Sequence, residues 1–166
     1  LVVVMEGSWK NKKIIKTTTF FGDKYVIKHE YVLQGGSSSV FGVVWNGGIK
    51  TTEKNLTEEL TYSEVFVAQN KNIESLHFAP SDNASVVEGF AVSGLTDWVA
   101  MRNKYFINSL ISSQSNGGLL GGSPFQLNEE SFIPQYSMRL DFKGFSNFSV
   151  DQYFGPLDVD LVEQSN

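Results

Sequence analysis

Residues 96–111 read TDWVAMRNKYFINSLI, two apolar runs separated by the polar triplet Arg102-Asn103-Lys104. As a helix, this segment places Arg102 in the middle of its apolar face, which an amphipathic helix avoids. As extended chain, each run alternates apolar and polar sides, and the triplet forms a bend between two strands. We therefore predict strand, bend, strand, with Trp98, Tyr105 and Phe106 largely buried. The alternative is a ligand site that combines these aromatic rings with the neighbouring cations.

Alternation with a period of two dominates the rest of the chain. In KYVIKHEYVL (24–33), for example, the apolar residues fall largely on one side and the charged residues on the other. Short strands at close spacing, with turn residues between them, predict an all-β fold: a large antiparallel β-sandwich with little helix. The best helix candidate is the short segment 54–60. Further strands are predicted at 14–21, 40–45, 62–69, 73–79, 86–94, 136–142 and 148–154.

Composition excludes several classes of function. The net charge of -5 is spread along the chain, so there is no basic stripe of the kind that binds nucleic acid or an anionic lipid surface. The chain has no cysteine, which excludes disulfides and thiolate chemistry. No apolar stretch approaches the roughly 20 residues that a membrane-spanning helix needs.

Catalytic and metal-binding patterns are also missing from the sequence. The two histidines, His29 and His77, each stand alone within a predicted strand. No Gly-x-Ser-x-Gly pentapeptide, the motif of a nucleophilic serine, occurs. The paired glycines lie between predicted strands, whereas a phosphate-binding loop is followed by a helix. We therefore assign no catalytic, cofactor-binding or metal-binding residue.

One glycine-rich segment stands out, SSQSNGGLLGGSPF (112–125), with four glycines around Leu119 and Leu120. Loop statistics favour a flexible hairpin tip. The functional interpretation is a mobile loop whose two leucines contact a partner protein, so Leu119 and Leu120 are the candidate partner-contact residues.

Four segments, in order along the chain, resemble one known family. Trp98-Val99-Ala100 followed by Tyr105-Phe106 is similar to a signature of the large periplasmic domain of YidC, the bacterial membrane protein insertase. The segments 14–33 and 43–55 resemble earlier parts of that domain. DQYFGPLDVDLV (151–162), with Gly155 and Pro156, resembles its closing segment.

The resemblance implies a β-supersandwich, the fold shared with galactose mutarotases and some carbohydrate-binding domains. It places the domain on the periplasmic side of the bacterial inner membrane. There it implies an accessory domain that helps insertion and folding of inner-membrane proteins and contacts SecDF, SecYEG and nascent membrane proteins. No enzymatic activity is expected. Fold alone does not separate this function from a mutarotase-like enzyme, which would need His29 or His77 to face a carboxylate, or from a carbohydrate-binding sandwich.

The chain opens with LVVVM (1–5), a continuous apolar run that is typical of the middle of a strand. We interpret residues 1–166 as a single, partial domain that lacks the first strands of the family's domain. An exposed sheet edge recruits another chain. We therefore expect association through the amino-terminal edge, and the alternative is that Val2–Val4 tuck into the sandwich.

Overall fold

The computed structural model of the chain describes residues 1–9, 11–35, 40–52, 54–78, 88–126, 132–158 and 160–161. Two antiparallel sheets make up most of the described part of the chain, and a short helix, α1 (Leu56–Thr61), overlaps the predicted segment 54–60. The prediction of an all-β antiparallel sandwich with little helix is confirmed. Among the described residues, no helix has the length and apolar character to cross a membrane.

The larger sheet has eight strands, and its order joins segments that are distant in sequence. The neighbouring strands β3 and β12 bring Val150 opposite His29, although these residues are far apart in sequence. Successive side chains of each strand point to opposite faces of the sheet, one face toward the smaller sheet and one face away from it. In spatial order the strands are β1 (Val2–Trp9), β2 (Lys12–Phe20), β3 (Val26–Gln34), β12 (Asn147–Pro156), β9 (Phe106–Ile111), β8 (Trp98–Arg102), β5 (Glu64–Gln69) and β6 (Asn72–Leu76).

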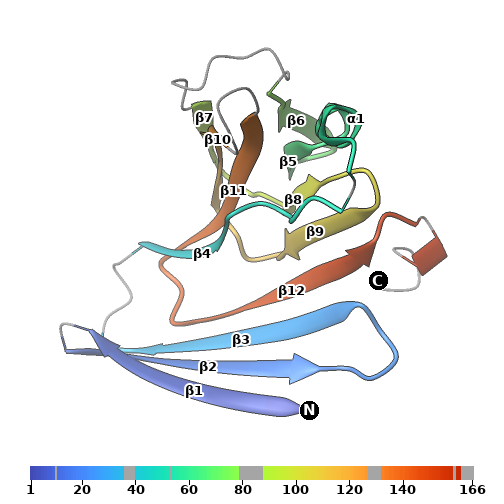
Figure 1. Ribbon diagram of the computed structural model, residues 1–166. Coiled ribbons are helices and arrows are strands. Elements are labelled where there is room, and N and C mark those ends of the chain that lie inside the picture. The colour runs from blue at the N-terminus through green and yellow to red at the C-terminus, as the bar shows by residue number, and fades with distance from the viewer. Residues whose placement is uncertain are drawn as a thin grey trace.

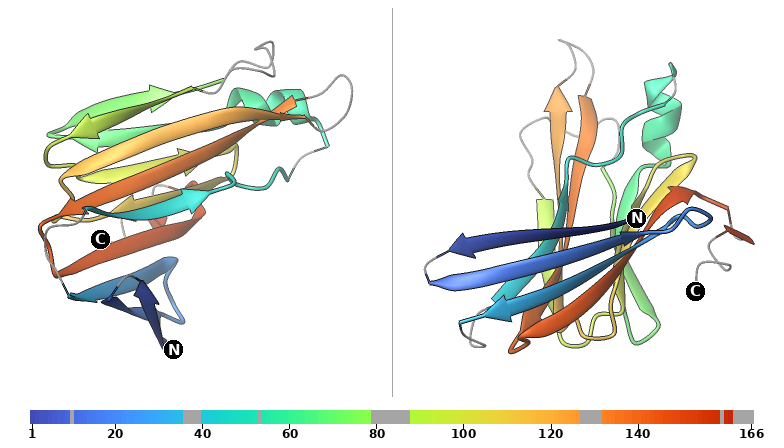
Figure 2. Two further views of the ribbon diagram at one scale, coloured as in Figure 1. Left: turned by 90° about the vertical axis from the view of Figure 1, so that its left-hand side faces the viewer. Right: turned by 90° about the horizontal axis from the view of Figure 1, so that it is seen from below.

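The smaller sheet covers only part of the larger one. It lies over β5, β8, β9 and β12, while β1, β2 and β3 extend beyond it (Figure 1). In the right-hand view of Figure 2, β1–β3 cross the direction of the remaining strands steeply, as expected when twist accumulates across a wide sheet. In spatial order the smaller sheet consists of β4 (Val40–Asn46), β11 (Phe132–Lys143), β10 (Gly117–Gln126) and β7 (Glu88–Ser93).

The core lies where the two sheets face each other. Phe142 of β11 stacks on Phe148 of β12, with ring centroids 4.0 Å apart, and Phe142 is fully buried. Apolar residues two apart along each strand share a face, so single strands supply several core residues each. The other core residues include Val65, Val67, Val99, Met101, Leu110, Leu120, Met138, Leu140 and Val150.

The segment 96–111 forms two strands joined by a tight bend, as predicted. β8 ends at Arg102 and β9 begins at Phe106. Asn103 determines the bend: its side-chain oxygen accepts hydrogen bonds from the backbone N–H groups of Tyr105 (3.0 Å) and Phe106 (2.8 Å). Asn103 is almost completely buried, so this short connection is fixed by its own side chain.

The predicted burial of the three aromatic residues is wrong for two of them. Tyr105 is 42% exposed and Phe106 36% exposed, because the bend and the first residue of β9 lie at the end of the sheet, where the smaller sheet does not cover them. Trp98 is half-buried, since alternation directs its side chain away from the core that Val99 and Met101 enter.

The glycine-rich segment is a second correction. Residues 117–126 form β10, a central strand of the smaller sheet, and are neither a hairpin tip nor a mobile loop. Glycines are used there because the neighbours approach closely: a Cβ on Gly122 would stand 2.2 Å from Phe78 Cε2. The glycines are therefore explained by close packing in a strand. Loop statistics gave the wrong prediction because they treat a high glycine content as a sign of a loop.

The remaining strand predictions agree with the structure except at their ends, and residues 79, 86 and 87 of two predicted strands lie outside the described residues. At the amino terminus, β1 is the outermost strand of the large sheet and pairs only with β2 among the described strands. Val2 is 59% and Val4 60% exposed. The alternative, that Val2–Val4 tuck into the sandwich, is therefore wrong, and association through this edge stays a prediction.

Candidate functional site

The outward face of the smaller sheet carries small and polar side chains above the backbone of β10 and β11. Alternation sends Leu120 and Met138 into the core and leaves Gly121, Ser123 and Ser137 on the outward side. A strand that presents glycine and serine outward exposes its main chain to a ligand or to another backbone.

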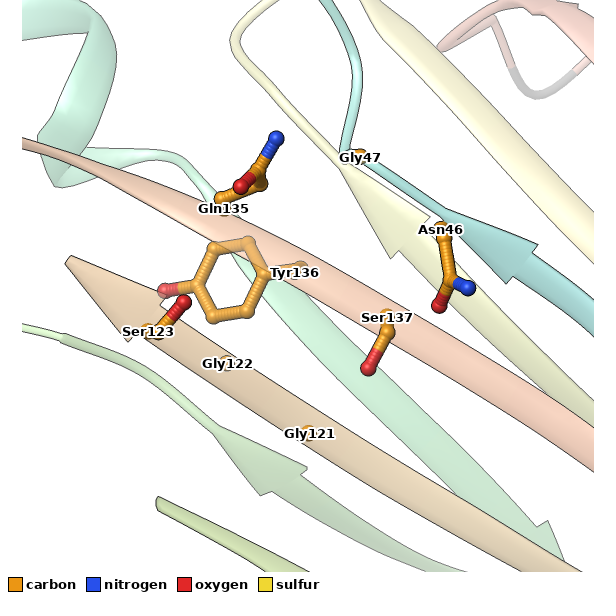
Figure 3. A pocket seen from close by; sticks show the side chains of 8 residues that line it. All are labelled: Asn46, Gly47, Gly121, Gly122, Ser123, Gln135, Tyr136 and Ser137. Carbon is orange, nitrogen blue, oxygen red and sulfur yellow. The ribbon is translucent and has the colours of Figure 1, made fainter. Parts of the chain in front are cut away.

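These residues form an open depression of about 390 Å³. Figure 3 shows the side chains of Asn46, Ser123, Gln135 and Ser137 arranged around the bare backbone of two neighbouring glycines. The full lining is Asn46, Gly47, Gly121, Gly122, Ser123, Gln135, Tyr136 and Ser137. We call this the glycine-floored depression. None of its lining residues carries a charge.

Three strands and one turn position this lining. Gly121 pairs with Ser137 across β10 and β11, and Asn46 at the end of β4 pairs with the same serine. Gly47 follows with a φ of 95°, which a glycine adopts without strain. The side chains of Asn46, Ser123, Gln135 and Ser137 have no hydrogen-bond partner among the described residues. Within the part of the chain that the structure describes, their donors and acceptors are therefore free for a bound group.

A second hollow of about 320 Å³ adjoins the depression and shares Gly47 and Gln135 with it. Its wall is more apolar, and Phe125 at this hollow is 50% exposed. The other lining residues are Ile49, Lys50, Thr51, Leu60, Ser63 and Ile133. The two hollows are therefore neighbours, the first polar over the glycines and the second more apolar beside Phe125.

Charge near the depression is internally neutralised. On the outward face of β11, the Arg139 guanidinium donates to the Asp141 carboxylate, with Nη2 and Oδ2 2.9 Å apart. The arginine stem lies over Gly42, where a Cβ would stand 2.6 Å from Cδ of Arg139. Because this ion pair satisfies its own charges, it gives the neighbouring surface little attraction for a charged ligand.

The two candidate contact leucines separate onto opposite sides of β10. Leu120 is 1% exposed and belongs to the core, so it is unavailable to a partner in the folded protein. Leu119 pairs with Arg139 on the outward face, next to the glycine-floored depression, and is half-buried. Only Leu119 keeps a position from which a partner can be contacted.

The family-motif residues at the end of the large sheet have packing roles. Val99 and Ala100 are buried in β8. A Cβ on Gly155 would stand 2.8 Å from Cγ of Tyr25, so the glycine leaves room for the tyrosine ring. Pro156 forms the last pair of β12 with β9, opposite Phe106. The motif holds the ends of adjacent strands together.

His29 belongs to a buried ladder of polar side chains across four strands. Gln152 Nε2 donates to Asn108 Oδ1 at 2.9 Å, and Gln152 Oε1 lies 3.1 Å from His29 Nε2. An amide oxygen only accepts, so Nε2 carries the proton and the neutral imidazole accepts the Thr18 hydroxyl at Nδ1, 3.1 Å away. Burial lowers the pKa of His29, and the hydrogen bond to Gln152 opposes this in part.

His77 lies elsewhere, with its Nδ1 3.0 Å from the carbonyl oxygen of Ser63. Neither histidine ring is hydrogen-bonded to a carboxylate, the arrangement that a mutarotase-like mechanism requires of its acid and base. Within the described ranges there is also no group of three or more His, Asp or Glu side chains that could hold a metal ion.

The sequence did not reveal the glycine-floored depression. Its lining comes from three strands, and Asn46, Ser123 and Ser137 each read as an ordinary turn or surface residue. The one available signal was the pair Gly121-Gly122, which sequence reasoning assigned to a loop. The polar ladder was equally hidden, because Thr18 and Gln152 are brought to His29 by strand order alone.

Comparison with known proteins gives a consistent result. The sequence profile of the YidC periplasmic domain matches residues 1–166. Membrane protein insertase YidC of Chlorobium phaeovibrioides is 35% identical over 160 residues, which cover 92% of this chain and 27% of that protein. The protein of the same name from Chloroherpeton thalassium is 32% identical, with 92% and 27% covered, and that from Prosthecochloris aestuarii is 31% identical, with 91% and 26% covered. The chain thus spans about a quarter of the length of these curated relatives.

Proposed function

Because the chain belongs to the family of YidC periplasmic domains, a part of an inner-membrane protein on its periplasmic side, we propose that it acts as a non-enzymatic contact domain. In this function it helps a membrane protein insertase to insert and fold inner-membrane proteins through protein–protein contacts. The partners that we propose are components of the Sec translocon (SecDF and SecYEG) and nascent membrane proteins. We propose residues 1–166 as one partial domain of the larger protein.

The observation that carries this proposal is the glycine-floored depression with its apolar neighbour. The bare backbone at Gly121 lets another main chain approach closely, and the free polar groups of Asn46, Gln135 and Ser137 match its N–H and C=O groups. The apolar hollow beside Phe125 accepts one large side chain of the same segment. An extended segment of a partner protein fits both parts.

The test uses photo-crosslinking amino acids in the intact insertase. Substitution at Ser123 or Ser137 places the probe in the depression, and substitution at Leu119 places it beside the depression. Thr17 supplies a control position on the outward face of the large sheet. We expect adducts with a translocon component or a nascent chain from Ser123 and Ser137 and none from Thr17. Adducts that arise only at Thr17 would exclude the depression as the contact surface.

A second variant fills the depression without touching the core. Ser137→Phe projects a ring outward over the glycines, whereas Thr17→Phe adds the same ring at the control position. We expect Ser137→Phe to abolish the adducts formed from Ser123, and to slow membrane insertion of substrates that depend on the domain. Unchanged adducts in Ser137→Phe would show that the partner binds elsewhere.

The mutarotase-like alternative is tested with the domain alone. We expect no interconversion of sugar anomers above the buffer rate, measured by NMR, because the His29 ring nitrogens are occupied by Thr18 and Gln152. Turnover that His29→Gln or His77→Gln abolishes would replace the proposed function with an enzymatic one. Sugar binding without turnover would favour a carbohydrate-binding module.

A further inference from the structure

The inner face of the large sheet continues beyond the smaller sheet along a row of cross-strand partners. Residues that pair across neighbouring strands share a face of the sheet. Phe148 of β12 stacks on Phe142 in the core, so the row that starts at Phe148 points inward. Cover decreases along the row, since Phe148 is 5% exposed and Met5 is 49% exposed. From β12 to β1 the row consists of Phe148, Tyr31, Lys16 and Met5.

Apolar side chains surround the outer part of this row. Ile14 and Phe20 lie on the same strand as Lys16 at even spacings from it, and Val3 has the same relation to Met5. Side chains at even spacings along a strand share a face, so these three also point inward. Val3 and Phe20 are exposed, and Ile14 is half-buried. We call this surface the open inner face: Val3, Met5, Ile14, Lys16, Phe20 and Tyr31.

β4 forms one edge of the smaller sheet, because among the described strands it pairs only with β11. The Tyr136 carbonyl of β11 accepts a hydrogen bond from the Gly48 N–H at 2.9 Å. Every second residue after Tyr136, Leu140 included, therefore directs its backbone groups toward β4. Val43 is the partner of Leu140 and shares these hydrogen bonds, whereas Val44 directs its N–H and C=O away from β11.

The edge of β4 lies beside the open inner face. In the left-hand view of Figure 2, β4 is the strand of the smaller sheet nearest to β1–β3. The Lys12 amino group of β2 lies 5.9 Å from the centroid of the Phe41 ring of β4. A strand added to β4 would continue the smaller sheet by about 4.8 Å and lie about 10 Å above the large sheet. Alternate side chains of that strand would point toward the open inner face.

We propose that β4 binds an extended segment of a partner protein as a further strand of the smaller sheet. The segment carries apolar side chains at alternate positions, with one carboxylate among them on the same side. Unpaired N–H and C=O groups along a sheet edge select another backbone, and the face beneath selects the side chains. This surface is separate from the glycine-floored depression, which lies on the outward face of the smaller sheet.

Lys16 is the reason for the carboxylate. Its amino group lies 5.6 Å from the centroid of the Tyr31 ring, on the open inner face. Among the described residues, none of the ion pairs includes Lys16. Burial lowers the pKa of Lys16, and a carboxylate placed beside the amino group would offset this cost of holding a charge away from water.

Peptide binding to the intact insertase in detergent tests the proposal. The probe is a fluorescent synthetic peptide in which valine alternates with threonine and one central valine is replaced by glutamate. We expect saturable binding in fluorescence anisotropy, and Lys16→Glu should bind this peptide at least about tenfold more weakly. A second peptide with lysine in place of the glutamate should show the reverse preference. Lys28→Glu, on the outward face of the same sheet, is the matched control and should bind like the parent protein.

Two further measurements locate the peptide. Val44→Pro removes an N–H that points away from β11 and should abolish binding, whereas Val44→Thr keeps the N–H and should bind normally. A photo-crosslinking amino acid at Met5 should form an adduct with the peptide, and one at Thr17, on the outward face, should not. Circular dichroism of every variant establishes that the fold is retained.

Several outcomes would overturn the proposal. Failure of the parent protein to bind the glutamate peptide would do so, as would equal losses in Lys16→Glu and Lys28→Glu. Normal binding by Val44→Pro would exclude pairing with β4. An insertase dimer that Val44→Pro dissociates and Val4→Pro leaves intact would assign the edge to a second copy of the chain. The crosslinking test of the glycine-floored depression is independent of all of these results.

Discussion

Gly122 of β10 lies directly against the ring of Phe78, and a Cβ on this glycine would stand 2.2 Å from the Cε2 atom of that ring. Phe78 cannot move away easily, because it is buried and its backbone N–H donates to the Tyr136 hydroxyl at 2.9 Å. We expect Gly122→Ala to lower the free energy of unfolding by about 2–3 kcal/mol, the range found when a packed core is overfilled. Urea denaturation measures this loss.

The control for this prediction is Gly7→Ala, since no atom lies within 4 Å of a Cβ built on Gly7 and this glycine also lies within a strand. It should leave stability unchanged or slightly raise it, because alanine restricts the unfolded chain. Equal losses in the two variants would mean that the effect comes from strand propensity and not from the contact with Phe78.

The core between the two sheets and the outward face of the large sheet predict unequal costs for removing an aromatic ring. Phe142 is fully buried against Phe148, so Phe142→Ala should cost about 3–5 kcal/mol through loss of apolar contacts and formation of a cavity. Trp98 is half-buried on the outward face, so Trp98→Ala should cost clearly less despite its larger ring. Thermal and urea unfolding of both variants compare the two losses, and a larger loss for Trp98 would contradict the assigned faces.

The polar ladder predicts that acid destabilises the protein. Burial lowers the pKa of His29 in the folded state, so the unfolded chain binds a proton more readily than the folded chain does. Stability from this residue is therefore complete above the unfolded pKa of about 6.5 and is lost as the pH falls toward the folded pKa. The melting temperature should drop between pH 7.5 and 5.5. Over this range the protonation of His29 should lower the free energy of unfolding by no more than about 1.4 kcal/mol per pH unit, the limit for one proton.

His29→Gln should flatten this slope, because it removes the titrating group and keeps an amide in the ladder. His77→Gln, which removes the other histidine of the chain, serves as the control and should retain the slope. Melting curves at a series of pH values decide between them. A slope that survives in His29→Gln would assign the acid sensitivity to another group.

Local pattern was sufficient to predict the secondary structure around 96–111, because two strands and a bend are encoded within that segment. The same reasoning failed at 117–126, because the glycines of β10 are required by close contacts with Phe78 and with other residues that are distant in sequence. Burial of Tyr105 and Phe106 was also mispredicted. Alternation assigns a side chain to a face of the sheet, but only the size of the opposing sheet determines whether that face is covered.

The candidate site could not be predicted from local sequence for a related reason. Gly121, Ser137 and Asn46 are neighbours because of the register of three strands. These strands are far apart in sequence, so local patterns do not predict that register. The family resemblance predicted partner contact without identifying the surface. Of the two leucines proposed for it, strand alternation retains Leu119 and assigns Leu120 to the core.

The outer edge of β1 predicts self-association of a polypeptide that consists of residues 1–166. Leu1 and Phe20 exchange both backbone hydrogen bonds, so alternation directs the N–H and C=O groups of Val2, Val4, Glu6 and Ser8 away from β2. Val2 and Val4 also have exposed side chains. Antiparallel pairing with a second copy of β1 would satisfy these groups and cover the valines together. We expect a dimer that forms with increasing concentration in sedimentation velocity.

Val4→Pro tests this edge with little disturbance of the sheet. It removes an N–H that points away from β2, and proline is tolerated on an edge strand in that position. The control Val4→Thr keeps the N–H and a β-branched side chain. We expect Val4→Pro to remain monomeric and Val4→Thr to dimerise like the parent chain. A parent chain that stays monomeric at high concentration, or a dimer that Val4→Pro leaves intact, would show that β1 is not the associating edge.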